Sequence, residues 1–225
     1  MLLPDLVGTR VLLIGGGGSV GRTTAKLAQE LGATPVVADQ DEEAFERARS
    51  VVGDVETHVV DARNEASVGA VLDAAAADHV VLCTGRTLIK PLVDIELDEL
   101  MDWVGDRFEP IFAVGKWIAR NPGRLRSLTI VSGFLIRRPE PLIASWSMMG
   151  PAIVGLAENL AVQLAPTRVN VVGPGPMVDS TMLRHELGSD EAAATFTRTL
   201  EERNPARRAS SEDRKSTRLN SSHRL

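Results

Sequence analysis

The feature that most constrains the fold of this 225-residue chain is a run of four glycines between an apolar segment and a segment of helical spacing. The apolar residues are Val11–Ile14, the glycines are 15–18, and the helical pattern begins at about Ser19. Glycine tolerates a positive φ and lets other groups approach its backbone, because it has no Cβ. The segment Arg10–Ala28 therefore predicts a strand, a tight turn and a helix, in that order.

The glycines have two spacings that are typical of a phosphate-binding turn in a dinucleotide fold. One is Gly16-x-Gly18-x-x-Gly21, and the other is Gly15-x-x-Gly18-x-x-Gly21. The helix that follows such a turn offers unpaired N–H groups and the positive end of its dipole to a pyrophosphate. The alternative is that the four glycines form a flexible turn that binds no nucleotide.

Apolar segments and helical segments keep alternating after this turn. Further strands are predicted at 34–38, 55–60, 78–84, 126–132 and 168–172, and helices at 41–51, 64–76, 97–121, 146–164 and 190–203. Pro110 is expected to kink or split the long fourth helix, and a loop with Pro139, Pro141 and Pro151 is expected around Trp146. The alternation predicts an α/β fold, a Rossmann-like doubly wound parallel sheet with helices on both faces.

Asp39 ends the second predicted strand, about twenty residues beyond the glycines, where this fold uses an acidic residue to bind the adenosine ribose. A carboxylate there accepts hydrogen bonds from the ribose hydroxyls and repels a 2′-phosphate. This position favours NAD over NADP as the cofactor. The alternative is that Asp39 only caps the N-terminus of the next helix.

Composition and charge exclude several classes of protein. The net charge of −5 gives no indication of nucleic-acid binding, and no apolar run is long enough to span a membrane. Residues 1–9 lack a signal-peptide pattern, and the single cysteine, Cys83, excludes an internal disulfide. No pair of residues has metal-ligand spacing, so no metal site is expected. We therefore expect a soluble cytoplasmic protein.

The order of these motifs resembles the short-chain dehydrogenase/reductase family over about residues 8–212. The shared features are the glycine turn, Asp39, Asp61-Ala62, the strand end VVLCTG, the strand SLTIVSG and the segment RVNVVGPGPM. The resemblance implies a one-domain NAD(P)-dependent oxidoreductase that acts on a small carbonyl or alcohol substrate. It also implies which residues contact the cofactor: Gly15, Gly17, Gly18, Ser19 and Val20 at the pyrophosphate, Asp61 and Ala62 at the adenine, Cys83 to Gly85 at the nicotinamide ribose, and Pro174 and Gly175 at the nicotinamide.

The family's catalytic residues are missing from their expected positions. The Tyr-x-x-x-Lys motif reads Trp146-Ser-Met-Met-Gly150, the active-site asparagine aligns with Arg107, and the whole chain contains no tyrosine. Tryptophan cannot replace the tyrosine as an acid and base, because its indole N–H is only a hydrogen-bond donor. The segment Ser132–Pro139 instead resembles a tyrosine-less branch of the family, with the pattern Ser-Gly-x-Leu-x-x-Arg-Pro.

Ser132 is the best-placed hydroxyl to contact a substrate carbonyl, and it is our weak candidate for a catalytic residue. The alternative is that its hydroxyl forms a hydrogen bond to the backbone at the strand end. Weaker candidates are His185 as an acid, Arg137 and Arg138 for an anionic substrate, and Ser145 and Ser147, which helix capping explains equally well. Cys83 is interpreted as a buried, unreactive thiol.

The sequence predicts one NAD(P)-binding domain over residues 1–212 and a disordered, non-native-looking tail over 213–225. The final strand of the family's sheet is expected to be missing. The helices near 97–121 and 146–164, with Trp103, Phe112 and Trp117, match the segments through which family members form homo-oligomers. Two functions stay open: weak or unconventional redox chemistry, or a catalytically silent cofactor-binding or regulatory protein.

Overall fold

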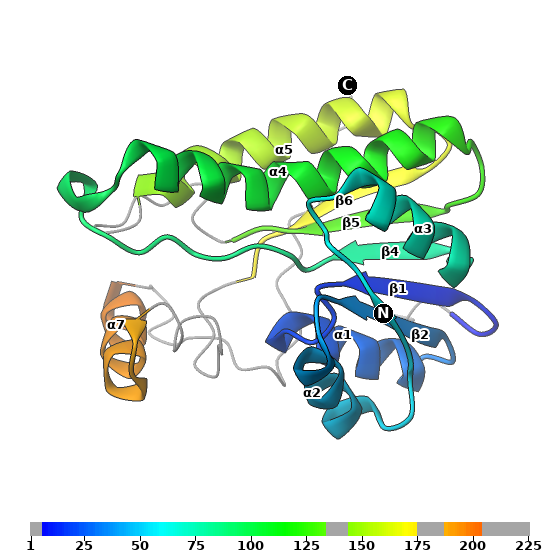
Figure 1. Ribbon diagram of the computed structural model, residues 1–225, viewed down its shortest axis with the longest axis horizontal. Coiled ribbons are helices and arrows are strands. Elements are labelled where there is room, and N and C mark those ends of the chain that lie inside the picture. Colours follow the sequence, from blue (N-terminus) through cyan, green and yellow to red (C-terminus); the bar gives the residue numbers. More distant parts are fainter. Residues whose placement is uncertain (1–5, 134–143, 175–186, 204–225) are drawn as a thin grey trace.

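The computed structural model describes residues 6–133, 144–174 and 187–203, and it has a six-stranded parallel sheet with helices on both faces (Figure 1). The strand order is β3-β2-β1-β4-β5-β6. The strands are β1 (Arg10–Ile14), β2 (Thr34–Asp39), β3 (Glu56–Val59), β4 (His79–Leu82), β5 (Ser127–Val131) and β6 (Arg168–Val172). The helices are α1 (Ser19–Glu30), α2 (Glu42–Val52), α3 (Glu65–Ala75), the short η1 (Leu92–Asp94), α4 (Leu97–Arg120), α5 (Ala144–Gln163) and α7 (Asp190–Arg203). The predicted fold class is confirmed.

Strand β1 shows how the sheet divides the core into two layers. Its residues alternate between the two faces, so Val11 and Leu13 pack with α1 and α2, whereas Leu12 and Ile14 pack with α3, α4 and α5. Leu12, Leu13 and Ile14 have no exposed surface. Burial on both faces explains why this strand is continuously apolar in sequence.

The chain crosses from one half of the sheet to the other after β3, and this crossing determines where a ligand can bind. Strands β1, β2 and β3 run outward to one edge, and β4 returns to pair with the other side of β1. The carboxyl ends of β1 and β4 therefore diverge into separate loops. In open parallel sheets, ligands bind in the crevice at such a switch point.

Helix α4 runs through Pro110, so the split that was one of the two expected outcomes does not occur. Helix α5 begins at Ala144, so Trp146 and Pro151 lie in the helix predicted over 146–164, and the loop expected around Trp146 is wrong at these two residues. Ser145 is not a helix cap, because its buried Oγ donates a hydrogen bond to the carbonyl oxygen of Leu88 at 3.1 Å. The remaining predicted elements agree with the structure to within two residues at each end.

The large aromatic residues of α4 have different environments. Trp103 and Trp117 are buried in the core, whereas Phe112 is 51% exposed. Only Phe112, of these three, is therefore available at the surface of the described part of the chain.

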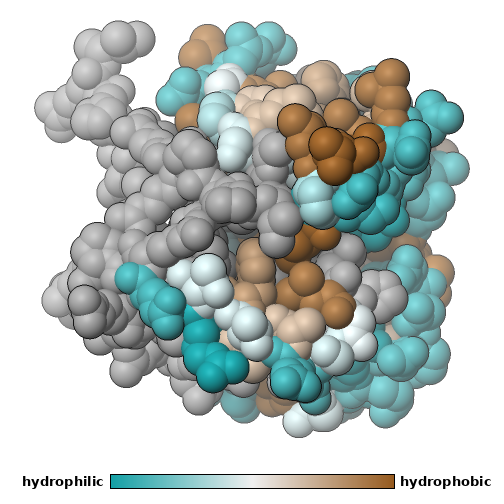
Figure 2. Space-filling model, turned by 90° about the vertical axis from the view of Figure 1, so that its left-hand side faces the viewer, coloured by the Kyte–Doolittle hydropathy of each residue, from teal (hydrophilic) through white to brown (hydrophobic). Residues whose placement is uncertain are grey.

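Figure 2 shows further apolar surface at the end of the molecule that carries the start of α4, where Leu92, Val93, Leu97 and Met101 are exposed. Among the described helices, none combines the length and apolar character needed to cross a membrane.

Candidate functional site

A cleft of about 550 Å³ opens at the carboxyl ends of β1, β2, β3 and β4. Its walls come from the loops that follow these strands, together with α2 and α4. The lining residues are Gly15, Gly18, Asp39, Gln40, Arg47, Val59, Val60, Asp61, Ala62, Arg63, Cys83, Thr84, Gly85, Arg86, Asp106 and Pro110. Seven of the residues predicted to bind a cofactor therefore lie together: Gly15, Gly18, Asp39, Asp61, Ala62, Cys83 and Gly85.

The first part of the glycine turn is fixed by the end of β2. Gly15 has a φ of +81° and donates its N–H to the carbonyl oxygen of Ala38 at 2.8 Å. A Cβ on Gly17 would lie 2.5 Å from the carbonyl oxygen of Ala44, so Gly17 packs directly against the first turn of α2. Both positions need glycine for the fold itself, whatever the cleft binds.

Gly18 is different, because the surrounding structure does not require a glycine there. Its φ is −71°, and an added Cβ would contact only the carbonyl oxygen of Gly15, at 3.4 Å. Gly18 lines the cleft and is the N-cap residue of α1, with no side chain to occupy the first N–H groups of the helix. The room at Gly18 and the uncapped helix end together fit a phosphate group. The other predicted residues of this turn, Gly17, Ser19, Val20 and Gly21, support the turn without lining the cleft.

Asp39 lies at the cleft and holds the glycine turn. Its Oδ2 accepts a hydrogen bond from the N–H of Gly17 at 2.8 Å, and its Oδ1 accepts one from the N–H of Gln40 at 2.9 Å. The alternative role as a helix cap is wrong, because Asp41 caps α2 by accepting from the N–H of Ala44 at 2.9 Å. Asp39 therefore lies at the cleft and does not cap the helix.

The loop after β3 forms another wall of the cleft. Asp61 accepts a hydrogen bond from the N–H of Arg63 at 3.0 Å, and its own N–H donates to Ser67 Oγ at 3.0 Å. Asn64 then caps α3 by accepting from the N–H groups of Ala66 and Ser67. These bonds close a tight turn that presents Asp61 and Ala62 to the cleft.

The loop after β4 is held by one face of α4. The guanidinium of buried Arg107 donates hydrogen bonds to the carbonyl oxygens of Thr84, at 3.2 Å, and Arg86. The indole N–H of Trp103 donates to the same Arg86 oxygen at 2.9 Å. Gly85, between them, has a φ of +106°, and a Cβ there would lie 2.5 Å from Arg107 Nε. Arg107, in the position of the family's asparagine, therefore shapes this wall of the cleft.

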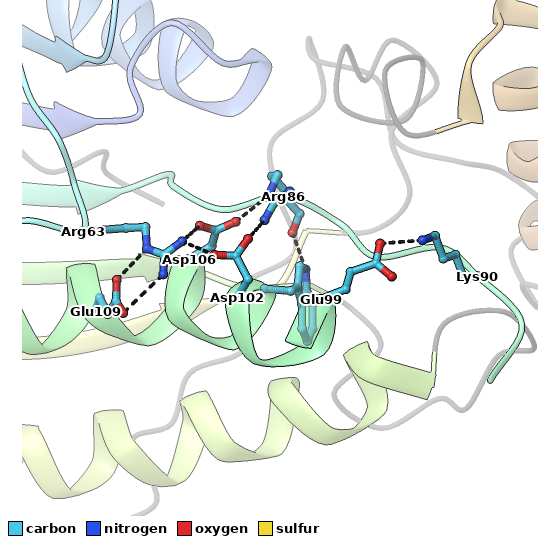
Figure 3. Close-up of polar contacts among 8 residues, drawn as sticks. Arg63, Arg86, Lys90, Glu99, Asp102, Asp106 and Glu109 are labelled. Atoms are coloured by element: carbon cyan, nitrogen blue, oxygen red, sulfur yellow. Dashed lines mark hydrogen bonds and ion pairs between the residues drawn. The ribbon is translucent and has the colours of Figure 1, made fainter. Parts of the chain in front are cut away.

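Arg63 and Arg86 connect both loops to the same carboxylates of α4 (Figure 3). Asp102 and Asp106 each pair with both arginines, at 2.5–3.1 Å, and Glu109 pairs with Arg63 at 2.6 Å. Lys90 pairs with Glu99 in the first turn of α4. Glu109 and Asp102 raise the pKa of Arg63 above its ordinary value, and Arg63 followed by Arg86 lowers the pKa of Asp102. The two arginines of the cleft wall are thus both paired with carboxylates of α4.

Cys83 and the histidines of the described chain are poorly suited to chemistry in this cleft. Burial raises the pKa of the Cys83 thiol to about 12, and the nearby Asp39 carboxylate adds to this rise. The thiol is therefore protonated at neutral pH. His79 lies at the amino end of β4, where its Nδ1 is 2.8 Å from Ser127 Oγ. His58, expected near the start of a strand, is the third residue of β3 and contacts Glu56.

Ser132 lies one residue beyond the end of β5 and is 4% exposed. Its backbone N–H donates to the carbonyl oxygen of Val172, but its Oγ has no hydrogen-bond partner among the described residues. The predicted hydrogen bond between this hydroxyl and the backbone is therefore absent from that part of the chain. Ser132 and Pro174, which follows β6, are at the same edge of the sheet as the cleft but do not line it. The candidates Gly175, Arg137, Arg138 and His185 lie outside the described residues, as does the tail 213–225.

Sequence reasoning missed the three arginines of the cleft. Arg63 and Arg86 follow residues already singled out, Asp61-Ala62 and Cys83 to Gly85, so the rule that ligands bind beyond the strand ends could have included them. Arg47 gave a weaker signal, because it lies in the middle of an amphipathic helix with four other charged residues. No cluster of potential metal ligands occurs in the residues that the structure describes.

A family model described as an SDR-like Rossmann domain matches residues 4–216 of the chain. A short-chain dehydrogenase/reductase of Stachybotrys chlorohalonatus, ATR9, is 28% identical over 211 residues, which are 86% of this chain and 83% of the relative. Carbonyl reductase [NADPH] 2 of Sus scrofa is 26% identical over 208 residues, covering 89% of this chain and 83% of the relative.

Solved structures of low sequence identity share the fold. The NAD⁺-bound xylitol dehydrogenase superposes with a TM-score of 0.77 and 22% identity, covering 93% of this chain and 89% of that one. The MalC reductase/Diels-Alderase of Malbranchea aurantiaca gives a TM-score of 0.78 and 23% identity, covering 92% and 86%. This similarity extends over nearly the whole chain.

Proposed function

Because the chain belongs to the short-chain dehydrogenase/reductase family, we propose that it binds NAD in the cleft and performs weak or unconventional redox chemistry on a small carbonyl or alcohol. The observation that carries this proposal is the open position at Gly18, beside a helix end that no side chain caps. The fold does not require glycine at position 18, the N-cap of α1. Close approach of a pyrophosphate to the backbone explains why a glycine occurs there.

The proposed preference for NAD rests on Asp39, whose carboxylate lines the cleft beside the glycine turn. A negative charge there repels the 2′-phosphate of NADP and accepts hydrogen bonds from the ribose hydroxyls of NAD. Proteins similar to this chain differ in this respect: the name of the porcine relative specifies NADPH, whereas the xylitol dehydrogenase structure is NAD⁺-bound. The preference therefore has to come from this chain's own residues.

The remaining cofactor contacts are proposed from the resemblance to the family. Gly15, Gly18 and the first turn of α1 would hold the pyrophosphate, with Gly17, Ser19, Val20 and Gly21 forming the turn. Asp61 and Ala62 would flank the adenine, Cys83 and Gly85 would lie at the nicotinamide ribose, and Pro174 and Gly175 at the nicotinamide. When bound, NAD would supply a site that accepts or donates a hydride.

Catalysis also needs a group that exchanges a proton with the substrate oxygen, and the chain has no tyrosine for this role. We propose that Ser132 contacts the substrate oxygen, since its buried Oγ has no partner among the described residues. A hydroxyl without a base is a poor acid, which is why we expect slow turnover. The absence of tyrosine supports the second candidate function, a catalytically silent cofactor-binding protein.

The proposed domain covers residues 1–212, with the tail 213–225 taking no part in the site. Self-association through α4 and α5, a cytoplasmic location and membership of a tyrosine-less branch of the family stay predictions from the sequence.

The test is a fluorescence titration of NADH and NADPH on the wild type and on Gly18→Ala. We expect NADH to bind more tightly than NADPH, and the added methyl group to weaken NADH binding by about tenfold or more, equivalent to at least 1.4 kcal/mol. Stability should change by about 1 kcal/mol or less, because the site accommodates a Cβ. The matched control is Gly69→Ala in α3, where a Cβ would have only an ordinary contact, 3.8 Å from Trp117.

Equal NADH affinity in Gly18→Ala and the wild type would exclude the glycine turn as the binding site. A second measurement separates the two candidate functions. Substrate-dependent oxidation of NADH that disappears in Ser132→Ala would support redox chemistry, whereas saturable binding without turnover of any carbonyl substrate would support the silent protein.

A further inference from the structure

We propose that η1 and the first turns of α4 form a docking surface for a basic, amphipathic segment of another protein. The surface combines four exposed apolar side chains with three exposed carboxylates. We call it the α4 tip, and its residues are Leu92, Val93, Asp94, Glu96, Leu97, Asp98 and Met101. None of these residues lines the cleft, so the proposal concerns a separate face of the molecule.

The apolar part of the α4 tip is surface that the fold leaves uncovered (Figure 2). Four large apolar side chains have exposed fractions of 58–89%: Leu92, Val93, Leu97 and Met101. Leu97 and Met101 are four residues apart in α4 and therefore lie on one face of the helix. Exposed apolar patches with a polar rim mark interaction sites.

Other side chains hold this segment in place, so the exposed ones are not needed to anchor it. Ile95 and Leu100 are partly buried and pack against the cluster that contains Trp103. Lys90, just before η1, pairs with Glu99 at 2.5 Å. The α4 tip is therefore a preformed surface whose outer apolar side chains contribute little to the stability of the fold.

Carboxylates without an ion pair surround the apolar side chains. Residues 91–102 contain five acidic residues and no lysine or arginine. Two of these carboxylates pair with Lys90 and Arg86. The other three are exposed and have no ion pair with any residue that the structure describes: Asp94, Glu96 and Asp98. The helix dipole explains only Asp98, because Asp94 and Glu96 precede the first turn of α4 and Glu96 makes no side-chain cap.

The charge of the α4 tip distinguishes between candidate partners. A symmetric contact between two copies would bring the same carboxylates face to face, because each copy contributes the same patch. A segment with apolar side chains flanked by lysine or arginine would instead cover the apolar residues and pair with the three carboxylates. This complementarity favours a basic partner over a second copy of the chain.

The test measures fluorescence anisotropy of a labelled helical peptide of leucine and lysine, about 14 residues or about four turns long, with the full chain. We expect saturable binding that weakens as salt is added, because salt screens the exposed charges. Val93→Ser should weaken binding by about fivefold or more, since an apolar contact is lost. The matched control is Val162→Ser near the C-terminal end of α5, where the valine is 80% exposed.

The carboxylates are tested by a double variant, Asp94→Asn with Glu96→Gln. We expect this variant to weaken peptide binding by about threefold or more and to reduce its salt dependence. The matched control is Asp54→Asn with Glu158→Gln, which removes two exposed carboxylates elsewhere. Because all of these positions are exposed, the urea unfolding midpoints should stay close to that of the wild type.

Three results would overturn the proposal: no saturable binding of the lysine peptide, equal binding of a peptide with glutamate in place of lysine, or equal losses in the tip variants and their controls. Sedimentation equilibrium tests the competing occupant. A self-association that Val93→Ser abolishes and Val162→Ser preserves would assign the α4 tip to a second copy, which also overturns the proposal. None of these outcomes depends on NADH, so the docking surface and the proposed function fail independently.

Discussion

Arg107 is a buried cation whose guanidinium satisfies two backbone carbonyls of the cleft wall. We expect Arg107→Leu to destabilise the protein by about 2–4 kcal/mol, because the oxygens of Thr84 and Arg86 lose charged donors in a site with little access to water. The measurement is the urea unfolding midpoint. The control is Arg120→Leu at the end of the same helix, where an exposed arginine pairs with Glu65 and should cost less than about 1 kcal/mol.

Equal destabilisation by the two leucine variants would mean that Arg107 acts only through its contribution to helix α4. Arg107→Lys refines the test, because lysine keeps the charge but lacks the planar fork that reaches two carbonyls. We expect an intermediate loss of stability for the lysine variant.

Asp39 shows what the sequence can and cannot predict about a single residue. Its place at a strand end, about twenty residues beyond the glycines, was enough to predict a position at the cleft. Its hydrogen bond to Gly17 was not predictable, because that bond depends on how the glycine turn folds back over β2. An alanine at this position would therefore disturb the turn as well as cofactor choice, and asparagine is the more informative substitution.

At the scale of elements, α4 is the support of the cleft wall. Asp102, Trp103, Asp106 and Arg107 lie on one face of the helix, and all four contact Arg86. We expect Asp106→Asn to cost about 1–3 kcal/mol, since its carboxylate, only 14% exposed, pairs with both Arg63 and Arg86. Chemical denaturation with urea measures this loss, and NADH affinity should fall as the loop after β4 loosens.

Asp98→Asn is the control for that prediction, because Asp98 is exposed in the first turn of the same helix. Its loss should cost less than about 1 kcal/mol through the helix dipole. If Asp98→Asn and Asp106→Asn gave the same change, the two shared carboxylates of Figure 3 would have no special role in holding the cleft wall.

Helix α4 also shows why the split expected as one outcome at Pro110 does not occur. A proline removes one backbone donor and was expected to kink or split the helix near Pro110. Tertiary packing keeps α4 one helix, because Pro110 is buried and Ile111 and Val114 belong to the core cluster against the sheet. Local propensity alone could not weigh a lost hydrogen bond against burial of the helix face.

At the scale of the whole molecule, the order of elements was predictable and the pairing of loops was not. Alternating apolar and helical segments, such as Val11–Ile14 followed by α1, are sufficient for a parallel sheet with right-handed crossovers. The contacts of Arg63 and Arg86 with the same two carboxylates join loops that lie more than twenty residues apart in sequence. Such contacts depend on the final distance between loops, which no local pattern encodes.

The sheet, its helices and the proposed cofactor site are linked thermodynamically, so NADH should stabilise the entire fold. At an NADH concentration one hundred times Kd, the expected gain is about 2.7 kcal/mol, which for a chain of this size raises the Tm by about 5–10 °C. Differential scanning calorimetry measures this shift. At the same NADH concentration, a tenfold weaker affinity leaves Gly18→Ala about half of this gain, about 1.4 kcal/mol, whereas Gly69→Ala should show the full increase above its own baseline. The stabilisation is set by the ratio of the NADH concentration to Kd. The Kd derived from calorimetry must therefore agree with the Kd derived from fluorescence. If NADH changed the fluorescence without raising the Tm, NADH would not bind the folded chain in preference to the unfolded chain. This result would exclude the cleft as the NADH site.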